Sequence, residues 1–363
     1  MKQPRFAFEG RKIIESRLFY PAVALALILL FDAIFIPGFF QLEIKEGHLF
    51  GNLIDVLRNS TPIIILAMGM TLVIATGGVD LSVGAVMAIA ASTACIMLNP
   101  NLIGLRLADV TREADPTYSA FPLWLVFLGP LAIAAVCGLW NGLLVAYGKI
   151  EPMVATLILM IAGRGIAQLV TNAIKIIIYN NKFLQLGNGW VLLLPFALYI
   201  AAFVFVLAWL LTRRTALGLF IESVGINSRS SFFSGIDEKK IKLFAYVFCG
   251  FCAGIAGLIA VSSIRTSDAN QVGLYSELDA ILAVIIGGTL LGMGGRFSLL
   301  ASVIGALVIQ ATTTSTLAIG VPASAIIAVK ALVVIVVIIL YSQQVRDVVR
   351  KLAGQSRLKE SKS

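Results

Sequence analysis

The sequence predicts an all-α integral membrane protein with about ten transmembrane helices. Of its 363 residues, 59% are hydrophobic and only 13% are charged, whereas a soluble domain usually carries about 25% charged residues. The apolar residues gather in long runs that recur along the chain. Each run approaches the roughly 20 residues that a helix needs to cross the hydrocarbon of a bilayer. Water is therefore not the main solvent of this protein.

Polar and Pro/Gly-rich stretches divide the chain into a best count of ten spans, within a range of eight to eleven. The range arises because residues 78–82 and 291–296 fit either a tight turn or a broken helix. We expect an N-terminal tail at 1–17, one transmembrane domain at 18–342 and a C-terminal tail at 343–363. The expected spans are 18–36, 60–77, 82–98, 121–146, 152–172, 191–212, 241–263, 279–291, 297–318 and 323–342.

Lysine and arginine predict the orientation of these spans, because positively charged loops stay in the cytoplasm. If the N-terminus lies inside, 19 lysines and arginines fall in cytoplasmic segments and seven fall outside. Both termini are therefore expected in the cytoplasm. The net charge of +9 does not indicate a nucleic-acid partner, since the basic residues form no single solvated face.

Small residues inside the spans predict close helix packing. Cys249 and Cys252 form a CxxC without a second ligand pair, so we expect packing residues and no metal site. Gly250 and Gly254 are spaced as GxxxG on the same span, which is typical of helices that approach closely.

The longest interior cytoplasmic segment, residues 213–240, is amphipathic. Leu217, Phe220, Ile221 and Val224 fall at helical spacing, which predicts a short helix lying across the membrane surface. Glycine and an Asn/Ser cluster then indicate turns on both sides of a second short helical piece. A segment of this kind offers a protruding surface to a cytosolic partner.

Several motifs resemble one known family. The segment ALGLFIESVGIN, followed by Gly235-Ile236, is similar to the coupling loop of the ribose-type family of bacterial ABC sugar permeases. IATGGVDLSVGAVMAIA, ATLILMIAGRGIAQLVT and GGRFSLLASVIGALVIQ match the same family, and the likeness is strongest to galactofuranose-importer permeases. The chain departs from the family at Ser230-Ser231, where alanines are more common.

The resemblance implies a permease subunit of a bacterial inner membrane and not an enzyme. Its expected partners are a cytosolic ABC ATPase, a second permease, a periplasmic sugar-binding protein and the lipid bilayer. The chain has no GxxxxGK[ST] phosphate loop, so ATP and Mg are expected on the ATPase and no cofactor on this chain. The residues implied for contact with the ATPase are Leu219, Glu222, Gly225, Asn227 and Gly235, with Gly225 in a turn between the two short helices.

Polar residues inside the spans are candidates for the translocation path. Arg164 lies about 12 residues from the start of its span, which places it ~18 Å deep and requires it to face protein or water. Such residues also join helices or cap them, and both interpretations stay open. The candidates are Thr76, Asp80, Asn141, Arg164, Gln168, Gln310 and Thr313.

Outer segments supply the remaining candidates. Arg265, Asp268 and Glu277 are expected on the surface where the sugar-binding protein docks. Lys330 is expected to extend its ammonium toward the headgroups from the outer end of the last span.

Two alternative functions are an ion-coupled secondary transporter and an integral-membrane enzyme. An ion-coupled transporter has no need of an amphipathic loop that contacts a cytosolic motor. A membrane enzyme is disfavoured because the chain has one histidine and no HExxH motif. The imported sugar is expected to be galactofuranose or another monosaccharide such as ribose. The sequence leaves the particular sugar open, and it also leaves open whether the second permease is an identical copy.

Overall fold

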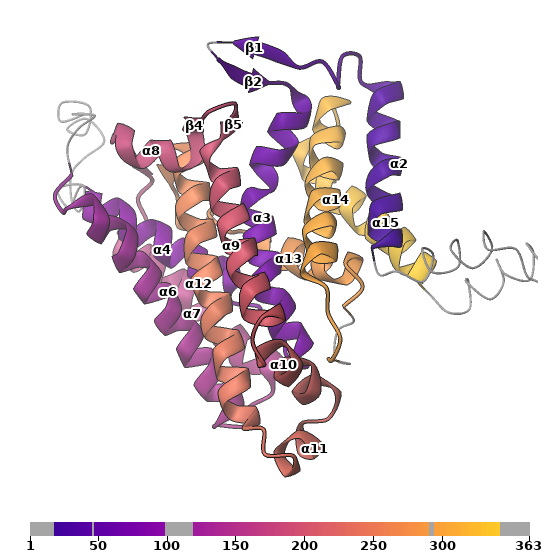
Figure 1. The fold of residues 1–363 in the computed structure, drawn as a ribbon. Helices are drawn as coiled ribbons and strands as arrows, with labels where there is room; N and C mark the ends of the chain where they lie inside the picture. Colours follow the sequence, from indigo (N-terminus) through magenta and orange to yellow (C-terminus); the bar gives the residue numbers. More distant parts are fainter. Residues whose placement is uncertain (1–17, 46, 99–118, 290–293, 342–363) are drawn as a thin grey trace, which may run out of the picture.

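The protein is a bundle of α-helices, described here by a computed structural model that covers residues 18–45, 47–98, 119–289 and 294–341 (Figure 1). Within these residues, six helices are long and apolar enough to cross a bilayer. They are α3 (Asn52–Ala75), α6 (Leu123–Ala146), α7 (Pro152–Val170), α9 (Phe196–Arg213), α12 (Glu238–Ile264) and α14 (Leu299–Ala318). The chain is therefore a multi-pass membrane protein.

Three shorter apolar helices occupy other predicted spans. They are α2 (Phe19–Phe35), α4 (Val83–Leu98) and α15 (Ile326–Tyr341), the last preceded by a short 3-10 turn, η2 (Ala323–Ala325). Their bounds agree with the predicted spans to within three residues. The predicted tails at 1–17 and 343–363 lie outside the residues that the structure describes.

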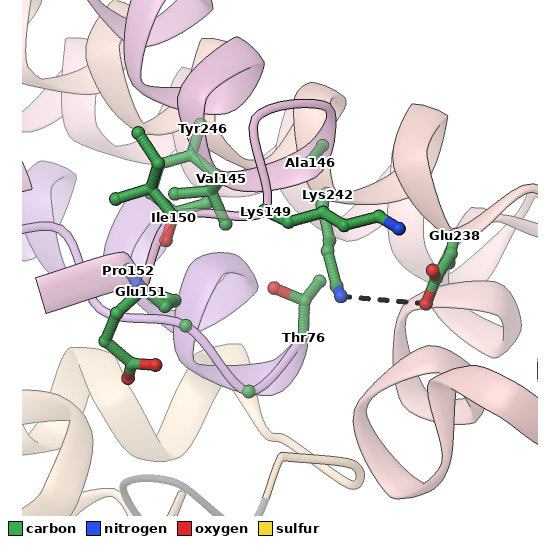
Figure 2. Close-up of a pocket in the computed structure, with 12 residues that line it drawn as sticks. Thr76, Val145, Ala146, Lys149, Ile150, Glu151, Pro152, Glu238, Lys242 and Tyr246 are labelled. Carbon is green, nitrogen blue, oxygen red and sulfur yellow. Dashed lines mark ion pairs between the residues drawn. The ribbon is translucent and has the colours of Figure 1, made fainter. Parts of the chain in front are cut away.

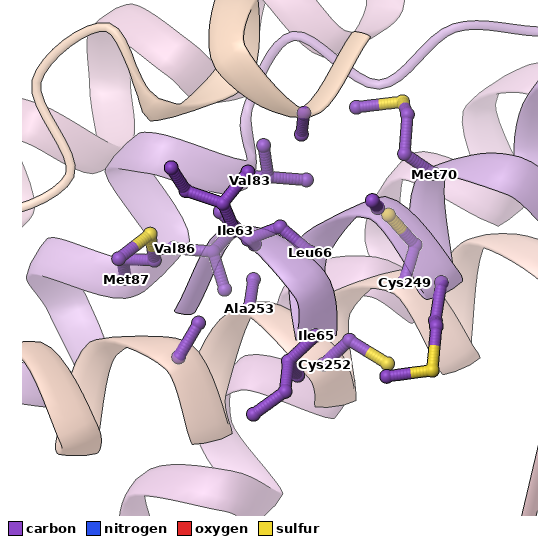
Figure 3. Close-up of a cluster of buried hydrophobic side chains, with 14 of the residues drawn as sticks. Ile63, Ile65, Leu66, Met70, Val83, Val86, Met87, Cys249, Cys252 and Ala253 are labelled. Carbon is purple, nitrogen blue, oxygen red and sulfur yellow. The ribbon is translucent and has the colours of Figure 1, made fainter. Parts of the chain in front are cut away.

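Helix α3 is the central helix of the bundle. Its apolar side chains are buried almost without interruption from Ile63 to Ala75, and residues of α4 and α12 surround them (Figure 3). A β-carbon placed at Gly69 would lie 2.8 Å from the Cα of Cys249 and 3.1 Å from the Cβ of Cys252. As predicted, the two cysteines are buried packing residues, here against the buried part of α3.

Glycines bring α12 against its neighbours. A β-carbon at Gly250 would lie 2.9 Å from the Cα of Gly138 on α6, and one at Gly254 would lie 2.7 Å from the Cβ of Ala134. One turn later, a β-carbon at Gly257 would lie 2.5 Å from the carbonyl oxygen of Met87 on α4. The close packing predicted from the GxxxG spacing is confirmed.

Three predicted span boundaries are wrong. The span at 279–291 is only α13 (Ser276–Ile286), whose 11 residues are too few to cross a bilayer. The span at 191–212 starts later, at Phe196, because a hairpin precedes it. The span at 60–77 starts earlier, at Asn52, because a polar first turn that carries Asp55 and Arg58 extends α3 beyond its apolar run.

The two ends of the bundle differ in structure (Figure 1). Two hairpins, β1 (Glu43–Lys45) with β2 (His48–Phe50) and β4 (Trp190–Val191) with β5 (Leu194–Pro195), lie at one end with α8 (Asn181–Asn188). A third antiparallel pair joins β3 (Ile176–Ile177), after α7, to β6 (Thr266–Ser267), after α12. The opposite end carries α10 (Leu217–Ile226) and α11 (Ser228–Phe233).

Candidate translocation path and coupling surface

Asp80 lies at the centre of a buried polar cluster in the non-helical stretch between α3 and α4. Its Oδ1 accepts hydrogen bonds from the Ser82 amide at 2.9 Å, the Ser82 hydroxyl at 2.6 Å and the Asn141 side-chain amide at 3.3 Å. These bonds hold Asp80 against the residue that precedes α4, and they leave both interpretations of Asp80, helix cap and path residue, open. Two predicted path residues, Asp80 and Asn141, are thus brought together, and both are buried.

The stretch 76–82 is a break between two helices inside the bundle. Thr76 ends α3 and donates its hydroxyl to the Val73 carbonyl at 2.8 Å. The Tyr246 hydroxyl of α12 donates to the carbonyl of Val79 at 3.3 Å, which satisfies one backbone group that the break leaves without a helical partner. Sequence reasoning missed this role of Tyr246, since a buried tyrosine in an apolar run carries no signal of its partner.

Arg164 is held by protein groups, as predicted from its depth. Its Nη1 donates to the carbonyl oxygens of Ala269 at 2.9 Å and Val272 at 2.6 Å. Both carbonyls belong to the segment 268–275, which leads from β6 to α13. The arginine therefore fixes a non-helical segment against α7, where irregular backbone needs protein partners because lipid offers none.

Glu277 is buried at the start of α13, with 4% of its surface exposed. A β-carbon at Gly84 would overlap its carboxylate, so this carboxylate lies against the first turn of α4. There it interacts electrostatically with Arg164 and with the positive end of the α4 dipole. The prediction that Glu277 lies on a docking surface is wrong, because the segment before it turns back into the bundle.

Gln168 lies one helical turn beyond Arg164 and donates to the side-chain oxygen of Asn270 at 2.5 Å. Asn270 and Gln271 are exposed. Asp268 is half-buried and caps this turn by accepting the Asn270 amide, while Arg265 is exposed at the end of α12. Sequence reasoning placed 264–278 in an outer loop and so did not pair Asn270 with the α7 residues.

Gln310 and Thr313 lie on α14 and are half-buried. Gln310 donates to Thr314 at 3.3 Å, and the Thr313 hydroxyl donates to the Ile309 carbonyl at 2.9 Å. The bonds described for these two side chains stay within α14. The structure therefore does not bring this pair to Arg164 or Asp80.

The predicted amphipathic loop forms two short helices. Ile221 and Val224 of α10 are buried, and the Asn227 side chain caps α11 by accepting the Ser230 amide at 2.9 Å. The Ser231 hydroxyl lies 2.8 Å from that of Ser223, so the serine that departs from the family pattern links α11 to α10. Gly235, with φ +82°, ends α11 as the turn that was predicted.

Gly225 lies inside α10, so its predicted place in the turn between the helices is wrong. The turn is at Asn227 instead. A β-carbon at Gly225 would overlap the carbonyl oxygen of Ala75, at the end of α3, and the amide nitrogen of Gly295. Gly295 itself donates to the Ala75 carbonyl at 2.8 Å. Glycine is required here for a three-way backbone contact and not for a turn.

The loop leaves four large apolar side chains exposed, while its Glu222 is half-buried. We call these four side chains the exposed apolar patch, and their exposed fractions are 68% for Leu219, 70% for Ile226, 63% for Phe232 and 77% for Phe233. Four such residues on two short helices indicate a contact surface for another protein.

Lys330 does not extend toward the headgroups as predicted. Its Nζ lies 2.8 and 3.0 Å from the two carboxylate oxygens of Asp279, and both side chains are more than 80% buried. The prediction failed because α13 packs against α15 and places the Asp279 carboxylate within reach of Lys330.

We expect Lys330→Met to lower the stability of the protein by ~3 kcal/mol, because it leaves the Asp279 carboxylate buried without its partner. The double variant Lys330→Met/Asp279→Leu should recover most of that loss, since no buried charge remains. A double-mutant cycle measures this coupling, with thermal melting in detergent of the unchanged protein, Lys330→Met, Asp279→Leu and the double variant. Single effects that simply add would show that the pair is not coupled.

A bundle of apolar helices with polar breaks inside it and an amphipathic loop at one end defines a membrane transport protein. Comparison with known proteins specifies the class further. Residues 52–341 match the family described as the permease component of the branched-chain amino acid transport system. The chain belongs to this permease family.

Its relatives include sugar permeases, to which it is similar over most of their length. The chain is 48% identical over 336 residues to the galactofuranose transporter permease protein of Escherichia coli strain K12, and 92% of each chain is covered. It is 36% identical to a fructose import permease protein of Bifidobacterium longum, covering 96% of this chain and 94% of the relative. It is 34% identical to the ribose import permease protein of Haemophilus influenzae, covering 83% and 84%. No solved structure matches the chain. The predicted resemblance is confirmed.

Proposed function

We propose that this chain is the transmembrane permease subunit of an ATP-driven importer that moves a sugar, galactofuranose or a similar monosaccharide, into the cytoplasm. The observation that carries the proposal is the loop at 213–240. It exposes an apolar patch and packs through Gly225 on the backbone of α3 and of Gly295. A motor that pushes this loop would thus act directly on the ends of two membrane segments.

The proposed topology has ten crossings in the inner membrane and both termini in the cytoplasm. The six long helices and α2, α4 and α15 supply nine crossings. The tenth is the broken segment 265–286, which combines β6, the irregular segment 268–275 and α13. The transmembrane domain at 18–342 then places α10 and α11 in the cytoplasm.

The proposed partners occupy the two ends of the bundle. An ATPase subunit, which carries ATP and Mg, docks on the exposed apolar patch and Glu222, with Asn227 and Gly235 shaping the loop. A periplasmic sugar-binding protein docks at the opposite end, where Arg265 and Asp268 remain as candidates. A second permease completes the path, and the resemblance to galactofuranose permeases favours a homologous chain over an identical copy.

The proposed path uses polar groups on α7 and on the segment 268–275. Gln168, Asn270 and Gln271 offer amide donors and acceptors, which suit the hydroxyl groups of a sugar. Arg164 of α7 holds the segment 268–275 in place through the carbonyls of Ala269 and Val272. Asp80 and Asn141 hold the break at 76–82 in place, while Gln310 and Thr313 lie apart from these groups and carry less of the proposal.

One experiment tests both the orientation and the ATPase contact. In a cysteine-free chain, a single cysteine at Phe232 should crosslink to the ATPase subunit in membranes and resist a membrane-impermeant thiol reagent added to intact cells. A cysteine at Arg265 should instead react with that reagent and give no ATPase crosslink. Reaction of the Phe232 position from outside the cell would reverse the orientation and remove the proposed coupling role.

A further inference from the structure

A polar cavity of about 290 Å³ lies at the end of the bundle that carries α10 and α11. Its walls come from the end of α3 (76–78), the connection between α6 and α7 (149–152) and the first turns of α12. Figure 2 shows these three elements around it. None of the sites described above includes this cavity, although Thr76 and Tyr246 line it.

The cavity lies at the level where hydrocarbon meets the polar boundary. Four of the six long apolar helices begin or end at its wall: α3 at Ala75, α6 at Ala146, α7 at Pro152 and α12 at Glu238. A bilayer that covers these helices must place its headgroups close to their ends. This placement does not depend on which side of the membrane is the cytoplasm.

Apolar surface continues from the cavity along the bundle. Leu143 and Tyr147 at the end of α6 are 42% and 48% exposed, and Met153 and Val154 at the start of α7 are 49% and 51% exposed. These residues adjoin the lining residues in sequence, and they suit contact with acyl chains. A ligand with both a charged head and an apolar tail would match the two surfaces.

The lining carries two positive and two negative side chains. Lys242 lies 3.7 Å from Glu238, a loose ion pair that is partly exposed. Within the described part of the chain, no ion pair or hydrogen bond is found for the side chains of Lys149 and Glu151. Figure 2 shows the amino groups of Lys149 and Lys242 on one side of the cavity with the Thr76 hydroxyl, and the Glu151 carboxylate on the other.

The backbone of Lys149 is held in an uncommon conformation. Its φ is +55°, a left-handed value that a lysine adopts at some cost, and the flanking amides of Gly148 and Ile150 bond back to α6. Figure 2 draws the Lys149 side chain along the cavity. Lys149 and Glu151 are both exposed, so their charged groups are accessible to a ligand.

We propose that this cavity binds the headgroup of a zwitterionic phospholipid that carries both a phosphate and a primary ammonium, as phosphatidylethanolamine does. Lys149, Lys242 and the Thr76 hydroxyl contact the phosphate, and Glu151 accepts from the ammonium. The two signs of charge in the lining then each meet a partner of opposite sign.

Other ligands fit the lining less well. A neutral sugar would leave the charges of Lys149 and Glu151 without a partner of opposite sign, and a purely anionic lipid would leave Glu151 facing a negative charge. A choline headgroup has no N–H to donate to Glu151. The distinction between an ammonium that donates and one that cannot is the basis of the test.

The test compares headgroups on matched acyl chains. The purified chain, in nanodiscs of equal phosphatidylethanolamine and phosphatidylcholine, is extracted into mild detergent, and the lipids that remain bound are counted by native mass spectrometry. We expect about fivefold enrichment of phosphatidylethanolamine, as for one or two partly exposed charge contacts. Lys149→Asn, which tolerates the left-handed backbone, and Glu151→Gln should each reduce the enrichment to within twofold of unity.

Controls keep the result specific. Lys182→Asn, which removes an exposed lysine at the opposite end of the bundle, should keep the enrichment. Free phosphoethanolamine at millimolar concentration should weakly displace the bound phosphatidylethanolamine. Excess monosaccharide should not displace it. Equal retention of the two lipids, an enrichment that survives both substitutions, or displacement by sugar would each overturn the proposal. So would stronger retention of phosphatidylglycerol than of phosphatidylethanolamine in matched nanodiscs that contain these two lipids.

Discussion

Gly225→Ala should reduce ATP-driven sugar uptake at least tenfold, although the substitution adds a single methyl group. The new β-carbon overlaps the Ala75 carbonyl oxygen and the Gly295 amide, which are backbone atoms that cannot rotate away. Overpacking of this kind typically costs about 1–3 kcal/mol, and here the shift separates α10 from the end of α3. The measurements are sugar uptake and ATP hydrolysis by the reconstituted complex.

The matched control is Gly165→Ala on α7. A β-carbon there meets no atom within 4 Å, and alanine favours a helix over glycine by about 1 kcal/mol, so uptake should stay within twofold of the unchanged protein. We expect the Gly225→Ala complex to retain ATP hydrolysis while it loses uptake. Normal uptake in an assembled Gly225→Ala complex would show that this backbone contact transmits nothing.

Arg164→Leu should abolish most transport, with a loss of roughly 100-fold. The change leaves the carbonyls of Ala269 and Val272 without their donor and the buried Glu277 without a positive neighbour. Hydrogen bonds to a charged group contribute about 1.5–3 kcal/mol each, so segment 268–275 should detach from α7. Uptake, together with limited proteolysis within 268–275, measures both effects.

Arg164→Lys should recover part of the uptake, because an ammonium keeps the charge but cannot present the same fork of donors. The comparison variant is Arg58→Leu, which removes an arginine that pairs with Asp55 near the start of α3 and should change uptake less than twofold. If Arg164→Leu transported normally and melted at a higher temperature, the arginine would be a costly lipid-facing residue.

Much of the helical framework could be predicted from the sequence, because apolar runs of sufficient length form helices in lipid whatever surrounds them. The first residues of α7 and α12 follow from local signals: Pro152 begins α7, and Asp237 caps the start of α12. The amphipathic loop was also predictable, since its apolar positions repeat at helical spacing.

The irregular segments were not predictable in the same way. Residues 268–275 have the composition of an aqueous loop, and only the carbonyl partners of Arg164 show that they pack against α7. A carbonyl group has no sequence signature. The depth of Arg164 gave the one available signal, since a guanidinium placed there must find acceptors.

Contacts between distant segments explain the remaining errors. Gly225 resembles a turn glycine until Ala75 and Gly295 are placed beside it. Lys330 resembles a membrane anchor until the short α13 presents Asp279. In both cases the local pattern permitted two structures, and tertiary packing selected the one that the pattern did not favour.

The most direct test of the proposed function is sugar uptake by proteoliposomes that contain this chain with its ATPase and partner permease. We expect labelled galactofuranose, supplied with its binding protein, to accumulate only when ATP reaches the side that carries α10 and α11. Uptake should persist when ionophores collapse all ion gradients. Uptake that needs no ATP and stops with the ionophore would contradict the account and identify an ion-coupled transporter instead.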